Sequence, residues 1–228
     1  MKINNKEVKM VIFDLDGTLL DSLFIWKQVD INFFKKRNIL MPDDYTDKIA
    51  HMGLKKASHY TKERFNLKES PEEIVKEWEE EVVEQYRHQV KLKPYAKELL
   101  ELLKNKGCIL NVATASQECC YIPCLKNNNI YHYFKQITDV KEYNEGKNSP
   151  RIYLDIAKNN NVSPEEVLVI EDIVIALNSA KKGNFITCAI YDKICNEEEL
   201  KKEISDIYIT TFLDLINLIK KEDEYEQD

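Results

Sequence analysis

The sequence has no long apolar run near its start, no C-x-x-C pair and no excess of basic residues. The apolar run before Asp14, MVIF, spans only residues 10–13, far short of a signal-peptide core or a membrane span. Cys119 and Cys120 are adjacent, a spacing that suits neither a zinc site nor a disulfide framework. The formal net charge of −7 disfavours nucleic acid as a partner. We therefore expect a soluble, cytoplasmic protein with reduced cysteines, no membrane segment and no nucleic-acid partner.

The chain does have enough apolar residues for a packed core, because 43% of its 228 residues are hydrophobic. Its length suits one large domain or one domain with an insert. A short β-branched run, VKMVIF at 8–13, predicts the first strand. Residues 22–90 carry only helical patterns: a helix from Leu23 with Trp26, Val29 and Phe33 on one face, an irregular stretch at 39–53, and a helix at 54–65.

A capping box opens the next helix of this block. Ser70 and Glu73 stand at the capping positions, and Pro71 occupies the first helical position. The apolar residues that follow recur every four positions and predict a stripe that packs against another helix: Ile74, Trp78, Val82, Tyr86 and Val90.

Strands and helices alternate after Pro94. The expected helices are 95–106, 150–159, 173–182 and 212–221, and the expected strands are ILNVAT from 109, VLVIED from 167, FITCAIY from 185 and IYIT from 207. Such alternation predicts a parallel sheet with helices on both faces. We therefore predict a doubly wound α/β domain formed by residues 1–20 and 91–228, with an all-helical domain, residues 21–90, inserted into it. The last residues, EDEYEQD, are expected to form a solvated acidic tail.

Polar residues stand at the ends of three predicted strands, where ligands bind in open parallel sheets. The first strand ends in Asp14 and Asp16, and the others end in Thr114-Ala115-Ser116 and Glu171-Asp172. Carboxylates gathered at one edge repel each other unless a cation neutralises them, and all-oxygen ligands suit Mg²⁺. Lys147, just before the helix at 150–159, could hold a phosphate or neutralise a nucleophilic carboxylate. Each residue alone also fits a turn, a strand-end hydroxyl, a surface charge or a helix cap, but together they favour phosphoryl transfer.

The motifs around these residues resemble those of the haloacid dehalogenase superfamily. The pattern D-x-D-G-T-L-x-D-S is matched in full from Asp14 to Ser22, Thr114 closes a strand, Lys147 lies in a G-K-x-x-P stretch, and the Glu171-Asp172 pair follows a strand. The resemblance implies a Rossmann-like core with a C1-type helical cap inserted after the first strand, in the branch of phosphatases and β-phosphoglucomutases. It covers nearly the whole chain.

The resemblance also implies a role for each matched residue. Asp14 would attack phosphorus and form an aspartyl-phosphate, and Asp16 would act as the acid and then the base. Thr114, Ala115 and Lys147 would bind the phosphoryl oxygens. Mg²⁺ would be held by Asp14, the backbone carbonyl of Asp16, Asp172 and Glu171. Dehalogenases and phosphonate-cleaving relatives lack an acid at the position of Asp16, so its presence favours a phosphate ester as the substrate.

The inserted cap would select the substrate through a loop at 50–56, where His51, Lys55 and Lys56 are candidate contacts; for the two lysines, solvated surface positions are the somewhat favoured interpretation. We expect a Mg²⁺-dependent phosphatase acting on a small phosphorylated metabolite, such as a sugar phosphate or a similar phosphomonoester. A β-phosphoglucomutase-like phosphomutase is the alternative, although the loop has no arginine of the kind such mutases use. A non-catalytic binding protein is the third reading, which the intact motifs disfavour.

The chain departs from the family pattern at several positions that carry no catalytic group. Asn148 replaces a proline, Arg151 an aspartate and Ile173 a serine, while Gly183-Asn184 stands where relatives have Ala-Gly. Asparagine tolerates the left-handed conformation that ends many helices, so we expect that turn to be kept. Residue patterns leave the oligomeric state between a monomer and a weak homo-oligomer.

Overall fold

The computed structural model describes residues 1–49, 52–195 and 197–225. The chain divides into two compact units. The core unit comprises Met1–Ser22 and Lys91–Asp228, and the helical unit comprises Leu23–Val90. Each unit is described by itself below.

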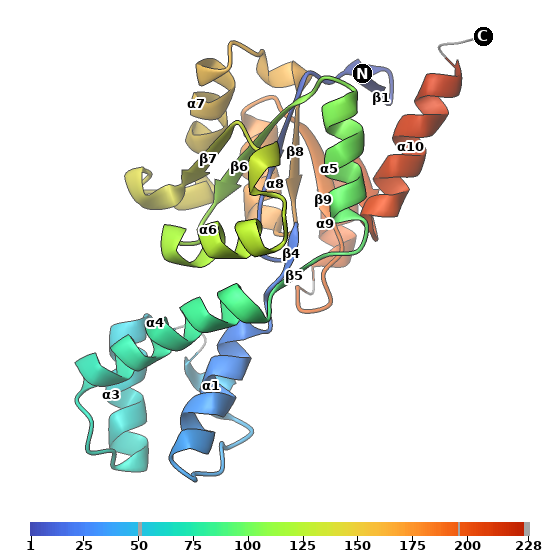
Figure 1. Cartoon of the computed structure of the whole chain (residues 1–228). Helices are drawn as coiled ribbons and strands as arrows, with labels where there is room; N and C mark the ends of the chain where they lie inside the picture. The colour runs from blue at the N-terminus through green and yellow to red at the C-terminus, as the bar shows by residue number, and fades with distance from the viewer. Residues whose placement is uncertain (50–51, 196, 226–228) are drawn as a thin grey trace. The chain divides into compact units, whose positions relative to one another are not determined.

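A six-stranded sheet forms the centre of the core unit (Figure 1). Its strand order is β10-β9-β8-β3-β6-β7, and every neighbouring pair is parallel. The strands are β3 (Met10–Phe13), β6 (Ile109–Thr114), β7 (Gln136–Asp139), β8 (Val167–Glu171), β9 (Ile186–Ile190) and β10 (Ile207–Ile209). Strands β3, β8 and β9 are buried along their whole length, as parallel strands covered on both faces must be. The predicted α/β fold with a parallel sheet is confirmed.

Helices cover both faces of this sheet. On one face, α7 (Arg151–Asn159) and α8 (Val174–Lys182) contribute to a buried cluster with alternate residues of β3 and β8, such as Met10 and Val169. On the other, α5 (Ala96–Asn105) contacts β6, and α10 (Phe212–Tyr225) lies against α5 (Figure 1). The remaining helices of the core unit are α6 (Glu118–Asn127) and α9 (Glu198–Ile204).

Short elements complete the core unit. Two antiparallel ribbons pair β1 (Lys2–Ile3) with β2 (Lys6–Glu7), and β4 (Leu20–Asp21) with β5 (Lys91–Leu92). Four 3₁₀ turns connect larger elements: η1 (Tyr131–Tyr133), η2 (Val140–Glu142), η3 (Gly146–Asn148) and η4 (Pro164–Glu166). The predicted left-handed turn after α8 is confirmed, because Asn184 has φ +63°.

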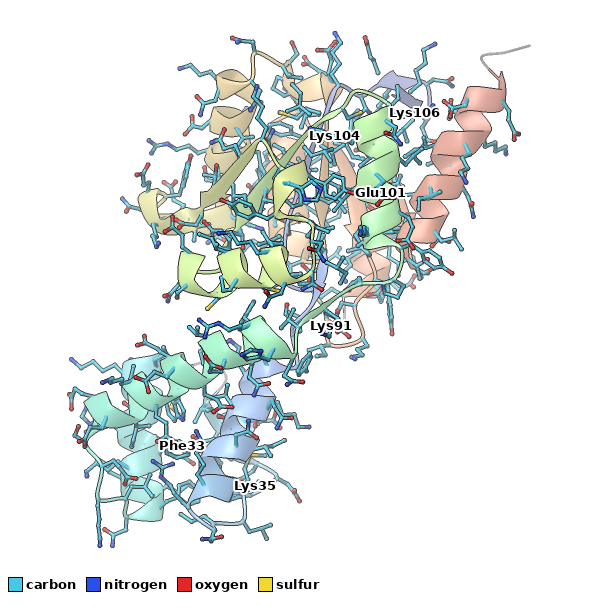
Figure 2. All side chains as sticks on the ribbon, in the orientation of Figure 1. Phe33, Lys35, Lys91, Glu101, Lys104 and Lys106 are labelled. Carbon is cyan, nitrogen blue, oxygen red and sulfur yellow. The ribbon has the colours of Figure 1, made fainter. Side chains whose placement is uncertain are left out.

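The C-terminal segment differs from the predicted solvated tail. Helix α10 runs to Tyr225 instead of ending at 221. Its acidic end has partners far away in sequence. Glu222 Oε1 accepts the Asn4 N–H at 3.1 Å, and Asp223 contacts Nζ of Lys106, which follows α5 and is labelled in Figure 2. The prediction was wrong for residues 222–225 because it judged the segment by polarity alone; residues 226–228 lie outside the described part of the chain.

Four helices form the helical unit: α1 (Ile25–Lys36), α2 (Tyr45–Ile49), α3 (Leu54–Phe65) and α4 (Pro71–His88). The capping box at α4 is confirmed, since the Ser70 hydroxyl accepts the Glu73 N–H at 3.1 Å and the Glu73 carboxylate accepts the Ser70 N–H at 2.7 Å. The expected irregular stretch at 39–53 is wrong in part, because it contains α2. Aromatic packing explains this, because Tyr45 is fully buried against Phe34 and Phe65.

Aromatic rings make up much of the core of the helical unit. Phe33 (labelled in Figure 2) meets Trp78 of α4 in an edge-to-face arrangement with centroids 5.6 Å apart. Trp26, predicted on the same face as Val29 and Phe33, is instead 49% exposed. Ile25 is buried with Val29 and Phe33 instead.

All six cysteines are free thiols. Within the described ranges, no helix combines the length and the apolar character needed to cross a membrane.

Candidate active site

The register of the sheet places Asp14 between two strand ends. Phe13 pairs with Val112 of β6 and with Ile170 of β8, so the next residue, Asp14, is level with the last residue of β8, Glu171. The Asp14 N–H donates to the Ile170 carbonyl at 3.0 Å, so sheet pairing fixes its backbone. Hence a central buried strand delivers this carboxylate to the carboxyl edge of the sheet.

Three carboxylates meet at this edge. Asp14, Glu171 and Asp172 are buried, and one oxygen from each lies within 4.8 Å of the other two. Lys147, held by η3, donates from Nζ to Glu171 Oε1 at 2.7 Å and also to Asp14 Oδ1. One ammonium group cannot neutralise three carboxylates, so the cluster carries an excess of negative charge when it is fully ionised.

That excess charge appears in the pKa values of the cluster. Burial raises the pKa of Glu171 to about 8, with Lys147 opposing and Asp14 reinforcing the effect. Burial and Asp14 raise the pKa of Asp172 to about 7, although Lys147, Lys93 and Lys201 pull it down. Burial also raises the pKa of Asp14. Burial disfavours the charge of Lys147, but Asp14 and Glu171 outweigh it and raise the pKa of the lysine.

The donor set fits a hard divalent cation. Glu171 Oε1 accepts two hydrogen bonds, whereas Oε2 is buried and has no hydrogen-bond partner among the described residues. A buried carboxylate oxygen without a partner is costly unless a cation or a bound water completes it. All the groups offered are oxygens, which Mg²⁺ and Ca²⁺ prefer over thiol or imidazole ligands.

Asp16 has surroundings quite unlike those of Asp14. It accepts a hydrogen bond from Ser22 Oγ at 2.6 Å on Oδ1, and another from Ser116 Oγ on Oδ2. Gly17 follows with φ +81°, a conformation that glycine adopts without strain, and the chain turns back toward β4. The hydroxyl groups of Ser22 and Ser116 therefore help to orient the Asp16 carboxylate.

Thr114 and Ala115 end β6 beside this turn. Thr114 is fully buried, and its Oγ1 accepts the Ser116 N–H at 3.0 Å, which leaves its own O–H to donate elsewhere. Ala115 is exposed. The predicted cap residues lie in the helical unit: Lys55 and Lys56 are exposed in the first turn of α3, and His51 lies outside the described residues.

Several residues of the site were not predicted from the sequence. The Tyr153 hydroxyl donates to Glu171 Oε1 at 2.7 Å, and the Thr18 hydroxyl donates to Asp172 Oδ1 at 3.3 Å. Tyr153 looks like a core residue of α7, since it lies between apolar neighbours on the buried face. The available signal was general: a tyrosine on a buried face needs a partner for its hydroxyl. Ser116 was recognised only as a strand-end residue.

Comparison with known proteins agrees with this geometry. The family model "Haloacid dehalogenase-like hydrolase" matches residues 11–190. The chain is 26% identical to a phosphorylated carbohydrates phosphatase of Thermotoga maritima, over 77% of this chain and 82% of that protein. It is also 26% identical to a phosphoglycolate phosphatase of Aquifex aeolicus, over 93% and 97% of the two chains.

Solved structures share the fold. A provisionally named β-phosphoglucomutase from Thermotoga maritima superposes with a TM-score of 0.84 at 23% identity, covering 94% of this chain and 99% of that one. A β-phosphoglucomutase from Clostridium difficile gives a TM-score of 0.66 at 18% identity, covering 97% and 100%. The family model spans well over half of the sequence, and the chain belongs to the family of haloacid dehalogenase-like hydrolases.

Proposed function

We propose that the protein is a Mg²⁺-dependent phosphatase that hydrolyses a small phosphorylated metabolite, a sugar phosphate or a similar phosphomonoester, through an aspartyl-phosphate. The observation that carries the proposal is the contact of Lys147 with Asp14 inside a buried acidic cluster. The lysine favours the ionised, nucleophilic form of Asp14 although burial opposes it. The two phosphatases to which the chain is similar support the same reaction class.

In the first step Asp14 attacks the phosphorus atom, and the bond from phosphorus to the ester oxygen breaks. Lys147 and the O–H of Thr114 stabilise the charge on the phosphoryl oxygens, with the backbone N–H of Ala115 as a third donor. Asp14, Glu171 and Asp172, together with the backbone carbonyl of Asp16, would hold Mg²⁺, which supplies positive charge to the cluster and to the phosphoryl group.

Asp16 is the proton carrier in both steps. In its protonated form it gives its proton to the departing alkoxide, and as a carboxylate it then takes a proton from the water that hydrolyses the aspartyl-phosphate. Its hydrogen bonds with Ser22 and Ser116 fix its orientation during this exchange. We propose that the helical insert, residues 21–90, selects the substrate, with His51, Lys55 and Lys56 as candidate contacts.

The test is phosphate release from a panel of phosphorylated metabolites, measured after chelation and again after addition of Mg²⁺. We expect release from one or more members with Mg²⁺ and loss of release in Asp14→Asn. Asp155→Asn is the matched control, because it makes the same change at a half-exposed position on α7.

Two outcomes would change the conclusion. Interconversion of sugar phosphate isomers that requires a bisphosphate primer would identify a phosphomutase instead. Phosphate release by Asp14→Asn equal to that of the wild type, or no turnover in any condition, would overturn the proposal.

A further inference from the structure

Tyr153, a core residue of helix α7, forms a hydrogen bond with the acidic cluster. Its side chain is fully buried, and its hydroxyl donates to Glu171 Oε1 at 2.7 Å. Lys147 Nζ donates to the same oxygen, also at 2.7 Å. Two donors therefore converge on one oxygen of one carboxylate.

This convergence makes the two oxygens of Glu171 unequal. Oε1 is occupied by Tyr153 and Lys147, whereas Oε2 is buried without a hydrogen-bond partner in the part of the chain that the structure describes. The terminal torsion of a glutamate is soft and roughly two-fold, so one donor alone restrains the carboxylate weakly. A second donor from a different element, α7, fixes the plane of the group.

The tyrosine ring is itself held in place by packing. The Phe185 ring meets it edge to face, with centroids 6.0 Å apart. Gly183 leaves space for Phe185, because a Cβ at that position would lie 2.7 Å from the Phe185 ring. A hydroxyl on a ring fixed in this way is a preorganised donor, not a mobile one.

We propose that Tyr153 is a positioning residue for the cation site: its hydroxyl orients Glu171 so that Oε2 is the oxygen that serves the cation, directly or through a bound water. This inference rests on the proposed function, because it takes the acidic cluster as the Mg²⁺ site. It assigns Tyr153 a role beyond packing, which phenylalanine in the same place could not fill. Partners that orient a ligand in this way commonly change metal affinity about 10–100-fold when they are removed.

The test compares Mg²⁺ binding to the wild-type protein and to Tyr153→Phe by isothermal titration calorimetry, with no substrate present. The substitution keeps the ring and removes only the hydroxyl. Tyr143→Phe is the matched control, because Tyr143 packs against the same core cluster and its hydroxyl donates to Asp155, outside the site. We expect the Mg²⁺ dissociation constant to rise about tenfold or more in Tyr153→Phe and to stay within twofold in Tyr143→Phe.

Equal affinities for the wild type and Tyr153→Phe would overturn the role of Tyr153 and leave the proposed function intact. A wild-type protein that binds no Mg²⁺ would overturn both. If Tyr153→Phe does not fold, as judged by circular dichroism, Phe185→Leu replaces it. That variant keeps the hydroxyl but removes the ring that holds Tyr153, so it should weaken Mg²⁺ binding by a smaller factor, and unchanged binding would refute the proposal.

Discussion

The acidic cluster should make the stability of the metal-free protein fall as the pH rises. In the unfolded chain Glu171 and Asp172 lose their protons near pH 4, at the usual pKa values of 4.5 and 3.8. In the folded protein burial raises these values to about 8 and about 7, so the folded cluster keeps protons that the unfolded chain has already lost. The free energy of unfolding therefore decreases from about pH 5 to pH 8.

The size of the effect follows from the same values. Each proton retained only by the folded state costs about 1.36 kcal/mol of stability for each pH unit, so Glu171 alone accounts for roughly 4 kcal/mol between pH 5 and pH 8. Glu171 and Asp172 repel each other and titrate as a coupled pair, so we take this single-proton figure as the smallest loss expected for the pair. A bound divalent cation replaces the protons, so added Mg²⁺ should stabilise the protein more at pH 8 than at pH 5.

Urea unfolding in EDTA at four pH values, followed by far-ultraviolet circular dichroism, measures this dependence. Both tryptophans, Trp26 and Trp78, lie in the helical unit, so their fluorescence reports the unfolding of that unit. If the helical unit and the core unit unfold in separate transitions, the fluorescence transition serves as an internal control. Glu171→Gln should flatten the pH dependence, whereas Glu165→Gln, on the exposed η4 turn, should not. A free energy of unfolding that is constant from pH 5 to pH 8 in EDTA would refute the reasoning.

Three further predictions concern single substitutions. Lys147→Met removes the ammonium group that contacts the buried carboxylates, so phosphate release should fall about 100-fold or more. The free energy of unfolding of the metal-free protein, measured in urea, should fall by about 3–5 kcal/mol. Asp30→Asn should stabilise the helical unit by about 1 kcal/mol at pH 8 and by less at pH 5, because burial raises the pKa of Asp30 to about 6. Tryptophan fluorescence during unfolding measures the stability of this unit, and an equal increase in stability at both pH values would contradict the prediction. Gly183→Ala brings a Cβ to 2.7 Å from the Phe185 ring and should cost about 1–3 kcal/mol by thermal melting, whereas Gly53→Ala, with no atom within 4 Å of its Cβ, should cost much less.

The strand ends of the site could be predicted from the sequence because they depend on local patterns. A buried apolar run followed at once by Asp14, and another followed by Glu171, give the positions of two strand ends, and parallel pairing brings such ends to one edge. Lys147 was also predicted as the positive group of the site, but its contacts were not. It reaches Asp14 and Glu171 because the turn η3 places it there, and a turn of three residues has no periodic pattern.

Elements with mixed polarity were missed for a related reason. Strand β7, with the sequence QITD, has only half-buried residues, so it shows no apolar run. Helix α6 contains Pro123, which weakens any helical reading of 118–127. For β7 a neighbour in space, not the local sequence, decides the structure, because its pairing with β6 fixes the strand.

The two acids after β3 show how position within a few residues can separate chemical roles. Asp14 lies in the sheet register and is buried among carboxylates, with the ammonium group of Lys147 as its partner, which favours the ionised form against the effect of burial. Asp16 lies past the end of the strand, where the turn at Gly17 brings its oxygens to two serine hydroxyls. Hydroxyl groups can donate to a carboxylate and accept from a carboxylic acid, so they keep Asp16 oriented in both protonation states. We propose that the serine hydroxyls at Asp16 support a proton carrier and the ammonium group at Asp14 supports a nucleophile.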